Sequence, residues 1–219
     1  MADVIRLTVV LFIISMVAGL ALALTNSKTK DKIAEQKILK NEAALQVVFP
    51  SGVDPIEKES NSDIPYPHWI GKKDNKLVGF AIKASNRGYS SNIEFIIGLD
   101  SIGKIFGLSI LSASGETPGL GTRLSESISD KYIWNGLFAK KQTVLPWFST
   151  QFKGIDVTKK IGIDKSKEWH RMSKTERQAI IKENKISALT GATISTRAVS
   201  DGISKSAGKY LSELKAKYN

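Results

Sequence analysis

The chain is 219 residues long, and its 42% hydrophobic and 24% charged residues are typical of a folded domain with a core, not of a low-complexity chain. The absence of cysteine excludes disulfides, thiolate zinc sites, iron–sulfur clusters and a cysteine nucleophile. The formal net charge is +11, but the lysines are spread from Lys28 to Lys217 with no arginine-rich run. We therefore predict no nucleic-acid partner, and a solvated surface near anionic lipid headgroups. His68 and His170 lie far apart without companion ligands, which predicts no metal site.

Residues 7–24 form an uncharged apolar run. As a helix at about 1.5 Å per residue it spans roughly 27 Å, just enough for the hydrocarbon layer of a bilayer. A cleaved signal peptide is the alternative, because Ala21-Leu22-Ala23 resembles a cleavage site, but the run is longer than the usual signal core. We predict a retained transmembrane anchor over residues 1–26. By the positive-inside rule, the lysines that follow it would keep the rest of the chain in the cytoplasm.

The rest of the chain predicts strands flanked by helices without regular β-α alternation, which indicates an α+β fold with a mixed or antiparallel sheet. Residues 27–75 read as a helical connector and loop, in which apolar residues at helical spacing extend the first helix to Val48 and the polar stretch 51–67 is a loop. Two β-prone runs joined by a short Asp/Gly turn, 93–99 and 104–111, predict a hairpin.

Other elements are predicted on either side of that hairpin. A capping box at Ser173–Glu176 opens a helix that ends near Glu183, and an amphipathic helix runs from Ser195 toward the C-terminus. The remaining predictions are a strand over 77–82, a turn at 86–88, a helix over 123–139 and an extended segment over 147–152.

The stretch 187–199 is a hydroxyl-rich loop that runs into the last helix. Gly191 lets the backbone approach a ligand closely, and the free N–H groups of a helix start favour a phosphate. The alternative is an ordinary hydroxyl cap on that helix. Thr190-Gly191-Ala192-Thr193-Ile194-Ser195 resembles the flavinylation signature Ser/Thr-Gly-Ala-Thr-x-Ser/Thr of the FMN-binding domain family.

The resemblance implies that Thr193 carries FMN covalently through a phosphoester, with Thr190, Gly191, Ala192 and Ser195 around the cofactor. It also implies a flavin transferase as the partner that attaches the flavin. The family often has Asp six residues before the acceptor threonine, and this chain has Ser187 there.

A second motif, Glu116-Thr117-Pro118-Gly119-Leu120-Gly121, resembles a loop of the G subunit of the Rnf complex and of the C subunit of the Na⁺-translocating NADH:quinone reductase. In those proteins the loop is implied to pack beside the isoalloxazine ring. Pro118 fixes φ, the glycines give clearance, and Leu120 offers an apolar face. Many relatives have a histidine shortly before the glutamate, whereas this chain has Ala113, Ser114 and Gly115. The residues of this motif predicted to contact the cofactor are Glu116, Thr117, Gly119, Leu120 and Gly121.

Together the two motifs imply an FMN-binding domain over residues 76–219 and an electron-transfer subunit of an Rnf-type, ion-translocating ferredoxin:NAD oxidoreductase complex. Such a subunit works with other membrane subunits, has no catalytic residues of its own, and exposes its flavin domain on the extracytoplasmic side of the cell membrane. The alternatives are the equivalent C subunit of the NADH:quinone reductase and a membrane-anchored binding module without redox function. A serine hydrolase is excluded because there is no Gly-x-Ser-x-Gly elbow.

Overall fold

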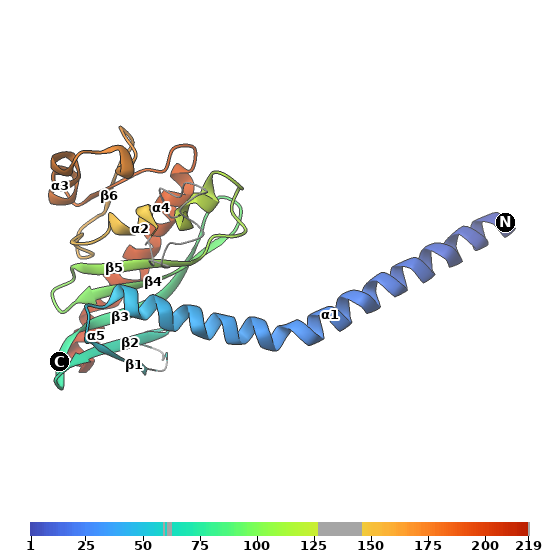
Figure 1. The fold of residues 1–219 in the computed structure, drawn as a ribbon, viewed down its shortest axis with the longest axis horizontal. Helices are drawn as coiled ribbons and strands as arrows, with labels where there is room; N and C mark the ends of the chain where they lie inside the picture. The colour runs from blue at the N-terminus through green and yellow to red at the C-terminus, as the bar shows by residue number, and fades with distance from the viewer. Residues whose placement is uncertain (59, 61–62, 127–145, 219) are drawn as a thin grey trace, which may run out of the picture. The chain divides into compact units, whose positions relative to one another are not determined.

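The structure, a computed structural model, describes residues 1–58, 60, 63–126 and 146–218 (Figure 1). The chain divides into two units, Met1–Glu42 and Ala43–Asn219. The first helix, α1 (Ala2–Val48), holds a stretch that is long and apolar enough to cross a membrane. That stretch is not buried inside the protein, as a lipid-facing segment requires. The helical continuation predicted as far as Val48 is confirmed.

The second unit is built on a five-stranded antiparallel sheet in which sequential strands pair. The turn between the second and third strands has Asp74 and Asn75 at positive φ angles of 49° and 62°, a conformation that Asp and Asn accept more readily than most residues. The strands are β1 (Asp54–Lys58), β2 (His68–Lys73), β3 (Lys76–Arg87), β4 (Asn92–Asp100) and β5 (Ile105–Ser112), and a separate parallel pair is β6 (Gly162–Asp164) and β7 (Lys185–Ser187).

The predicted hairpin is confirmed as β4 and β5. Its turn is organised by Asp100, whose Oδ1 accepts hydrogen bonds from the backbone N–H groups of Ile102, Gly103 and Lys104 at 3.0, 2.7 and 2.7 Å. A side chain that bonds to the backbone a few residues ahead mimics a turn, which is why Asp is common at this position.

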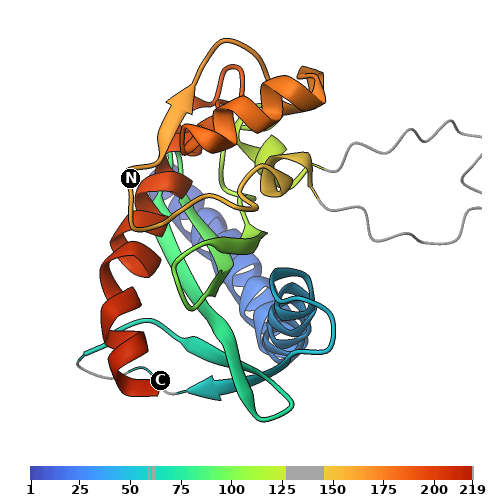
Figure 2. The ribbon, with the colours of Figure 1, turned by 90° about the vertical axis from the view of Figure 1, so that its left-hand side faces the viewer.

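All described helices except α1 come after the five-stranded sheet in the chain. The last three helical segments, residues 193–218, form one continuous run along one face of this sheet (Figure 2). The helices after α1 are η1 (Gly121–Ser125), α2 (Trp147–Thr150), η3 (Trp169–Arg171), α3 (Lys174–Lys182), α4 (Thr193–Ile203), the π-helical turn η4 (Ser204–Gly208) and α5 (Lys209–Tyr218). The C-terminal amphipathic helix predicted from Ser195 is therefore present and begins two residues earlier.

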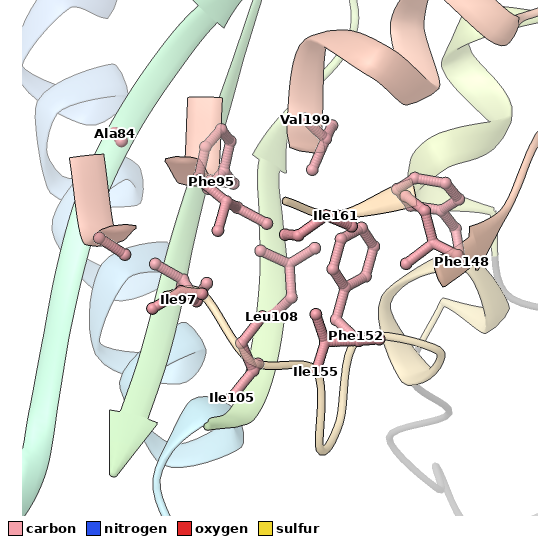
Figure 3. Packing of buried hydrophobic residues seen from close by; sticks show 14 of the residues in the cluster. Ala84, Phe95, Ile97, Ile105, Leu108, Phe148, Phe152, Ile155, Ile161 and Val199 are labelled. Carbon is pink, nitrogen blue, oxygen red and sulfur yellow. The ribbon is translucent and has the colours of Figure 1, made fainter. Parts of the chain in front are cut away.

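Both faces of the sheet are covered by apolar side chains. On one face the larger cluster includes Phe95 and Ile97 of β4 together with Val199 of α4 (Figure 3). On the other face Ile96 packs in a second cluster with Val48 at the end of α1. Because successive residues of a strand point to opposite faces, a strand buried on both sides reads as a continuous apolar run. The α+β fold class is confirmed.

Three predicted elements are wrong. The turn expected at 86–88 comes too early, because Asn86 and Arg87 pair with β4 as the end of β3 and the bend follows at residues 89–91. The loop expected over 51–67 contains β1, an edge strand whose residues are mostly exposed and so lack the alternating pattern of a half-buried strand. The extended segment expected over 147–152 is instead the short helix α2 followed by a turn, which directs Trp147, Phe148 and Phe152 into the core. In the helix expected over 123–139, η1 ends at an extended Glu126, and residues 127–139 lie outside the described residues.

The capping box at the start of α3 is confirmed: Ser173 Oγ accepts from the N–H of Glu176 at 3.3 Å, and Glu176 Oε2 accepts from the N–H of Ser173 at 2.6 Å. We expect Ser173→Ala to lower the free energy of unfolding by about 1 kcal/mol, because the N–H of Glu176 loses its acceptor, the Ser173 hydroxyl. Urea unfolding measures the change. Gln178→Ala, at an exposed site on the same helix, is the control and should leave the value close to wild type.

Candidate functional site

A cavity of about 520 Å³ lies where three segments of the second unit meet: the turn after β3, the loop before η1 and the start of α4. This volume falls in the usual range for small-molecule sites. The cavity is lined by Tyr89, Thr117, Leu120, Gly121, Gly191, Ala192, Thr193, Ile194 and Ser195. Tyr89, Leu120 and Ile194 are all exposed large apolar side chains, so the walls offer apolar surface to a ligand.

The start of α4 lacks a side-chain cap. Its N-cap residue is Ala192, and no side chain hydrogen-bonds to the cap. Within the described ranges no group accepts a hydrogen bond from the backbone N–H of Thr193, Ile194 or Ser195. The ordinary hydroxyl cap considered above is therefore not what the structure shows. Unpaired N–H groups and the positive end of the helix dipole together favour an anion at this point.

The chain enters α4 through Gly191, which has a φ of +77°. A side chain here would be strained by the backbone conformation, and its Cβ would lie 2.8 Å from Cδ2 of Leu120 across the cavity. The loop is also tied from within, because Thr196 Oγ1 accepts from the N–H of Leu189 at 3.0 Å and donates to the carbonyl oxygen of Ala192 at 3.1 Å.

Glu116 lies behind the cavity and is only 2% exposed. Its Oε1 accepts from the N–H groups of Ser90 and Ser91 at 3.0 and 2.9 Å. Its Oε2 accepts from the N–H of Tyr89 at 3.2 Å and from Ser195 Oγ at 2.6 Å. One carboxylate thus joins the three segments that line the cavity.

These contacts decide the ionisation of Glu116. Burial raises the pKa of this carboxyl, but the hydrogen bonds from Ser195 Oγ and from the N–H groups of residues 91, 90 and 89 outweigh it, so the pKa lies below its usual value. The carboxylate is packed closely as well: a Cβ on Gly121 would lie 2.7 Å from both Cβ and Oε2 of Glu116.

A second buried carboxylate, Glu168, contacts the loop that leads into α4 and is 4% exposed. Its Oε1 accepts from the N–H of Thr190 at 2.9 Å. Arg123 donates to both of its oxygens, at 3.3 and 3.4 Å. Burial raises the pKa of Glu168, and the hydrogen bonds from Thr190 together with Arg123 more than offset this, so its pKa is lowered.

The structure brings most of the predicted cofactor residues together. Thr117, Leu120 and Gly121 of the first motif, and Gly191, Ala192, Thr193 and Ser195 of the second, line one cavity. Glu116, Thr190 and Gly119 do not line it: Glu116 lies behind the wall, and the other two are exposed nearby.

Some residues of the site were not predicted. Tyr89 and Ile194 line the cavity, and Glu168 supports its loop. Ile194 stands at the variable position of the Thr-Gly-Ala-Thr-x-Ser motif, so its place within the motif could have indicated it as a site residue. No local sequence pattern indicates a role for Glu168. Ser187, which stands where the family often has Asp, is buried, and its Oγ donates to the carbonyl oxygen of Lys167 at 2.7 Å.

An antiparallel sheet backed by helices, a helix that can cross a membrane and an anion-favouring helix start beside an apolar-walled cavity define a membrane-anchored α+β ligand-binding protein. The chain belongs to the FMN-binding domain family, whose sequence model matches residues 88–207 and so covers both motifs. The family resemblance drawn from those motifs is confirmed.

Named relatives agree with this membership. The chain is 32% identical over 221 residues to the G subunit of the Na⁺-translocating ferredoxin:NAD⁺ oxidoreductase complex of Acetobacterium woodii, a match that covers 94% of this chain and 91% of that protein. It is 29% identical over 209 residues to the G subunit of an ion-translocating oxidoreductase complex of Shewanella piezotolerans, covering 89% and 83%. Among solved structures, NqrC of Shewanella oneidensis matches with a TM-score of 0.47 and 16% identity, over 78% of this chain and 73% of that one.

The two buried glutamates predict how stability depends on pH. Because their folded-state pKa values lie below the usual 4.5, the unfolded chain takes up protons first as the pH falls. Their stabilising contribution is therefore present above pH 4.5 and is lost as the pH falls through the folded-state values. We expect Glu116→Gln to lose less unfolding free energy than wild type between about pH 7 and about pH 3.5 in urea titrations. Glu126→Gln, at an exposed glutamate, should follow the wild type, and equal losses in all three proteins would contradict the prediction.

Proposed function

We propose that this protein is the FMN-carrying electron-transfer subunit of an Rnf-type, ion-translocating ferredoxin:NAD oxidoreductase complex, with FMN bound through a phosphoester to Thr193. One observation carries the proposal: within an FMN-binding domain, Thr193 lines the cavity at a helix start whose first N–H groups have no acceptor among the described residues. A phosphate is the group that such a helix start binds best.

Each wall of the cavity has a part in holding the cofactor. The N–H groups of Thr193, Ile194 and Ser195 would bind the phosphate, and the Thr193 Oγ would form the ester. Tyr89 and Leu120 offer apolar surface to the flat ring system and keep water from it. FMN supplies the redox chemistry when bound, and the chain holds it in place and sets the polarity around it.

The attachment step balances simply. With a flavin dinucleotide as the donor, a bond forms between Thr193 Oγ and the phosphorus of the FMN half, and the bond from that phosphorus to the bridging oxygen breaks. The other half leaves as a nucleoside monophosphate, the proton of the threonine hydroxyl is released, and the chain gains the mass of one FMN less one water. A flavin transferase would catalyse this step. A covalent bond prevents loss of the cofactor on a membrane face where no free pool would replace it.

The intact mass of the denatured protein tests the proposal. We expect wild-type protein from a host with the flavin transferase to carry the added mass, and its visible flavin absorbance to bleach on chemical reduction. An unmodified mass from the same host would reject the covalent cofactor. A protein that is also colourless as isolated would favour the membrane-anchored binding module without redox function.

We further propose residues 1–26 as the transmembrane anchor, followed by the helical connector. The flavin-bearing part is the compact unit from Ala43 onward, because the sheet includes β1 and β2. The boundary expected between residues 75 and 76 falls in the turn that joins two paired strands. The partners are the other subunits of the complex, in keeping with the names of the relatives.

The flavin domain is proposed to lie outside the cytoplasm, against the lysine bias near the helix, because long domains cross the membrane largely regardless of charge. The chain has no cysteine, so single cysteines can be introduced cleanly. We expect Lys153→Cys, at an exposed site of the second unit, to react with a membrane-impermeant maleimide on intact cells. Ala2→Cys is the matched control and should react only after permeabilisation. The reverse pattern would place the domain in the cytoplasm.

A further inference from the structure

Two buried carboxylates hold the two ends of the loop that presents Thr193. At the first end, Glu168 Oε1 accepts from the N–H of Thr190 at 2.9 Å. At the second, Glu116 Oε2 accepts from Ser195 Oγ at 2.6 Å. Neither carboxylate lines the cavity, and Thr193 lies between the two attachment points. The loop is therefore fixed from behind at both ends while its front faces the ligand space.

The need to fill space in the core does not explain why two ionised carboxylates, Glu116 and Glu168, are buried here. Burying an ionised carboxylate is costly, and an apolar side chain of similar size would fill the same volume at lower cost. The structure compensates each charge fully: Glu116 is surrounded by the N–H groups of residues 89–91 and the Ser195 hydroxyl, and Glu168 by the Thr190 N–H and Arg123. Each of these hydrogen bonds is directional, so it stabilises the carboxylate and also fixes the position of the segment that carries the donor.

The other groups that Glu116 and Glu168 bind also belong to segments next to the cavity. The N–H groups bound by Glu116 belong to the turn that carries Tyr89, and Arg123 belongs to η1, directly after the loop of Leu120. The two carboxylates thus fix the relative positions of all three segments that line the cavity.

We propose that Glu116 and Glu168 are positioning residues that hold loop 190–195 in the conformation that presents the Thr193 hydroxyl and the free N–H groups of α4 to the flavin phosphate. This rests on the proposed attachment of FMN to Thr193. The two residues act before the flavin is bound, since the contacts they make are all within the protein.

Amide variants separate this role from packing. In Glu116→Gln the amide NH₂ takes the place of one oxygen and meets a backbone N–H, donor against donor, although the side chain keeps its shape. In Glu168→Gln the same change weakens either the Thr190 contact or the pairing with Arg123. Glu126→Gln is the matched control, because Glu126 pairs with the same Arg123 at 3.1 Å but is exposed and does not touch the loop.

The first measurement is hydrogen exchange on full-length protein in detergent, made in a host without flavin transferase. We expect the hydrogen-bonded amides of the loop to exchange about tenfold to hundredfold faster in Glu116→Gln and Glu168→Gln, the factor that corresponds to one lost hydrogen bond to a charged group. These are the amides of Leu189, Thr190, Ala192 and Thr196. Amides of β3 and β4 should exchange as in wild type. Glu126→Gln should match wild type throughout.

The second measurement is the rate of flavin attachment by purified flavin transferase to the same four proteins. We expect the rate at saturating substrate to fall about tenfold or more in the two variants, with the KM for the flavin donor unchanged, because the donor binds the transferase and not these carboxylates.

The two measurements distinguish the possible failures. Unchanged loop exchange in both variants, or a uniform rise that includes β3 and β4, overturns the positioning role. Faster loop exchange with an unchanged attachment rate overturns it as well, because the loop conformation then does not matter to attachment. If the wild-type protein itself takes up no flavin, the proposed function fails, while the exchange data still decide whether the carboxylates hold the loop.

Discussion

We expect Thr193→Ala to abolish covalent flavin in protein made with the flavin transferase, and the intact mass of the denatured variant to equal that of the unmodified chain. The loss is complete because alanine has no oxygen with which to form the ester. The fold should be unaffected, since the Thr193 side chain is only half-buried and its hydroxyl makes no hydrogen bond to any described residue. A melting temperature close to that of unflavinylated wild type checks this point.

Two variants control the experiment. Thr193→Ser keeps a hydroxyl at the same backbone position and should still gain flavin, although more slowly if the methyl group helps to orient the oxygen. Thr190→Ala removes the other threonine hydroxyl of the motif and should still reach full modification on long incubation, because Thr190 does not line the cavity and its backbone N–H still binds Glu168. Flavin mass that persists in Thr193→Ala would place the ester on another hydroxyl.

We expect deletion of residues 2–26 to move the protein from the membrane fraction to the soluble fraction when the chain is expressed without other subunits. The deleted segment supplies the apolar run of α1, and apolar residues at the centre of a membrane helix each favour insertion by about 0.3 to 0.6 kcal/mol. The attraction of exposed lysines to anionic lipid is electrostatic and is weakened at alkaline pH, where lysine loses its charge, whereas the apolar contribution does not depend on pH. The compact unit from Ala43 keeps its own core and should remain folded.

The distribution between pellet and supernatant after an alkaline carbonate wash measures this effect. The control is a full-length variant with Lys28, Lys30 and Lys32 replaced by glutamine, which keeps the apolar run and should stay in the membrane. A truncated chain that still sediments with washed membranes would mean that the second unit binds the bilayer directly.

Several features of this protein follow from short stretches of sequence. The stretch of α1 that is long enough to cross a membrane is an uninterrupted apolar run, the β4–β5 hairpin is marked by two β-prone runs around Asp100, and the start of α3 is marked by Ser173 and Glu176. In each case the signal and the structure lie within one element or one turn, so local propensity and periodicity are sufficient. The two motifs likewise carry the family membership on residues that are adjacent in the chain.

Other features depend on contacts between distant residues. Glu116 and Ser195 are 79 residues apart, and Arg123 and Glu168 are 45 apart, so no local pattern links either pair. Glu116 was predicted to contact the cofactor because the resemblance implies that its motif packs beside the flavin ring, whereas in the structure it is buried behind the cavity wall. The helical form of α2 was missed because the core that receives Phe148 and Phe152 is assembled from other segments.

The long apolar N-terminal helix, the α+β class and the family membership could be predicted from the sequence alone, because they depend on hydrophobic patterning and on residues next to one another. Only the tertiary structure decided that the two motifs share one cavity, that the helix start lacks a side-chain cap, and that two buried carboxylates hold the loop. The physical reason is that a buried charge is tolerated only where the fold brings enough donors to it, and those donors come from segments that the chain sequence keeps apart.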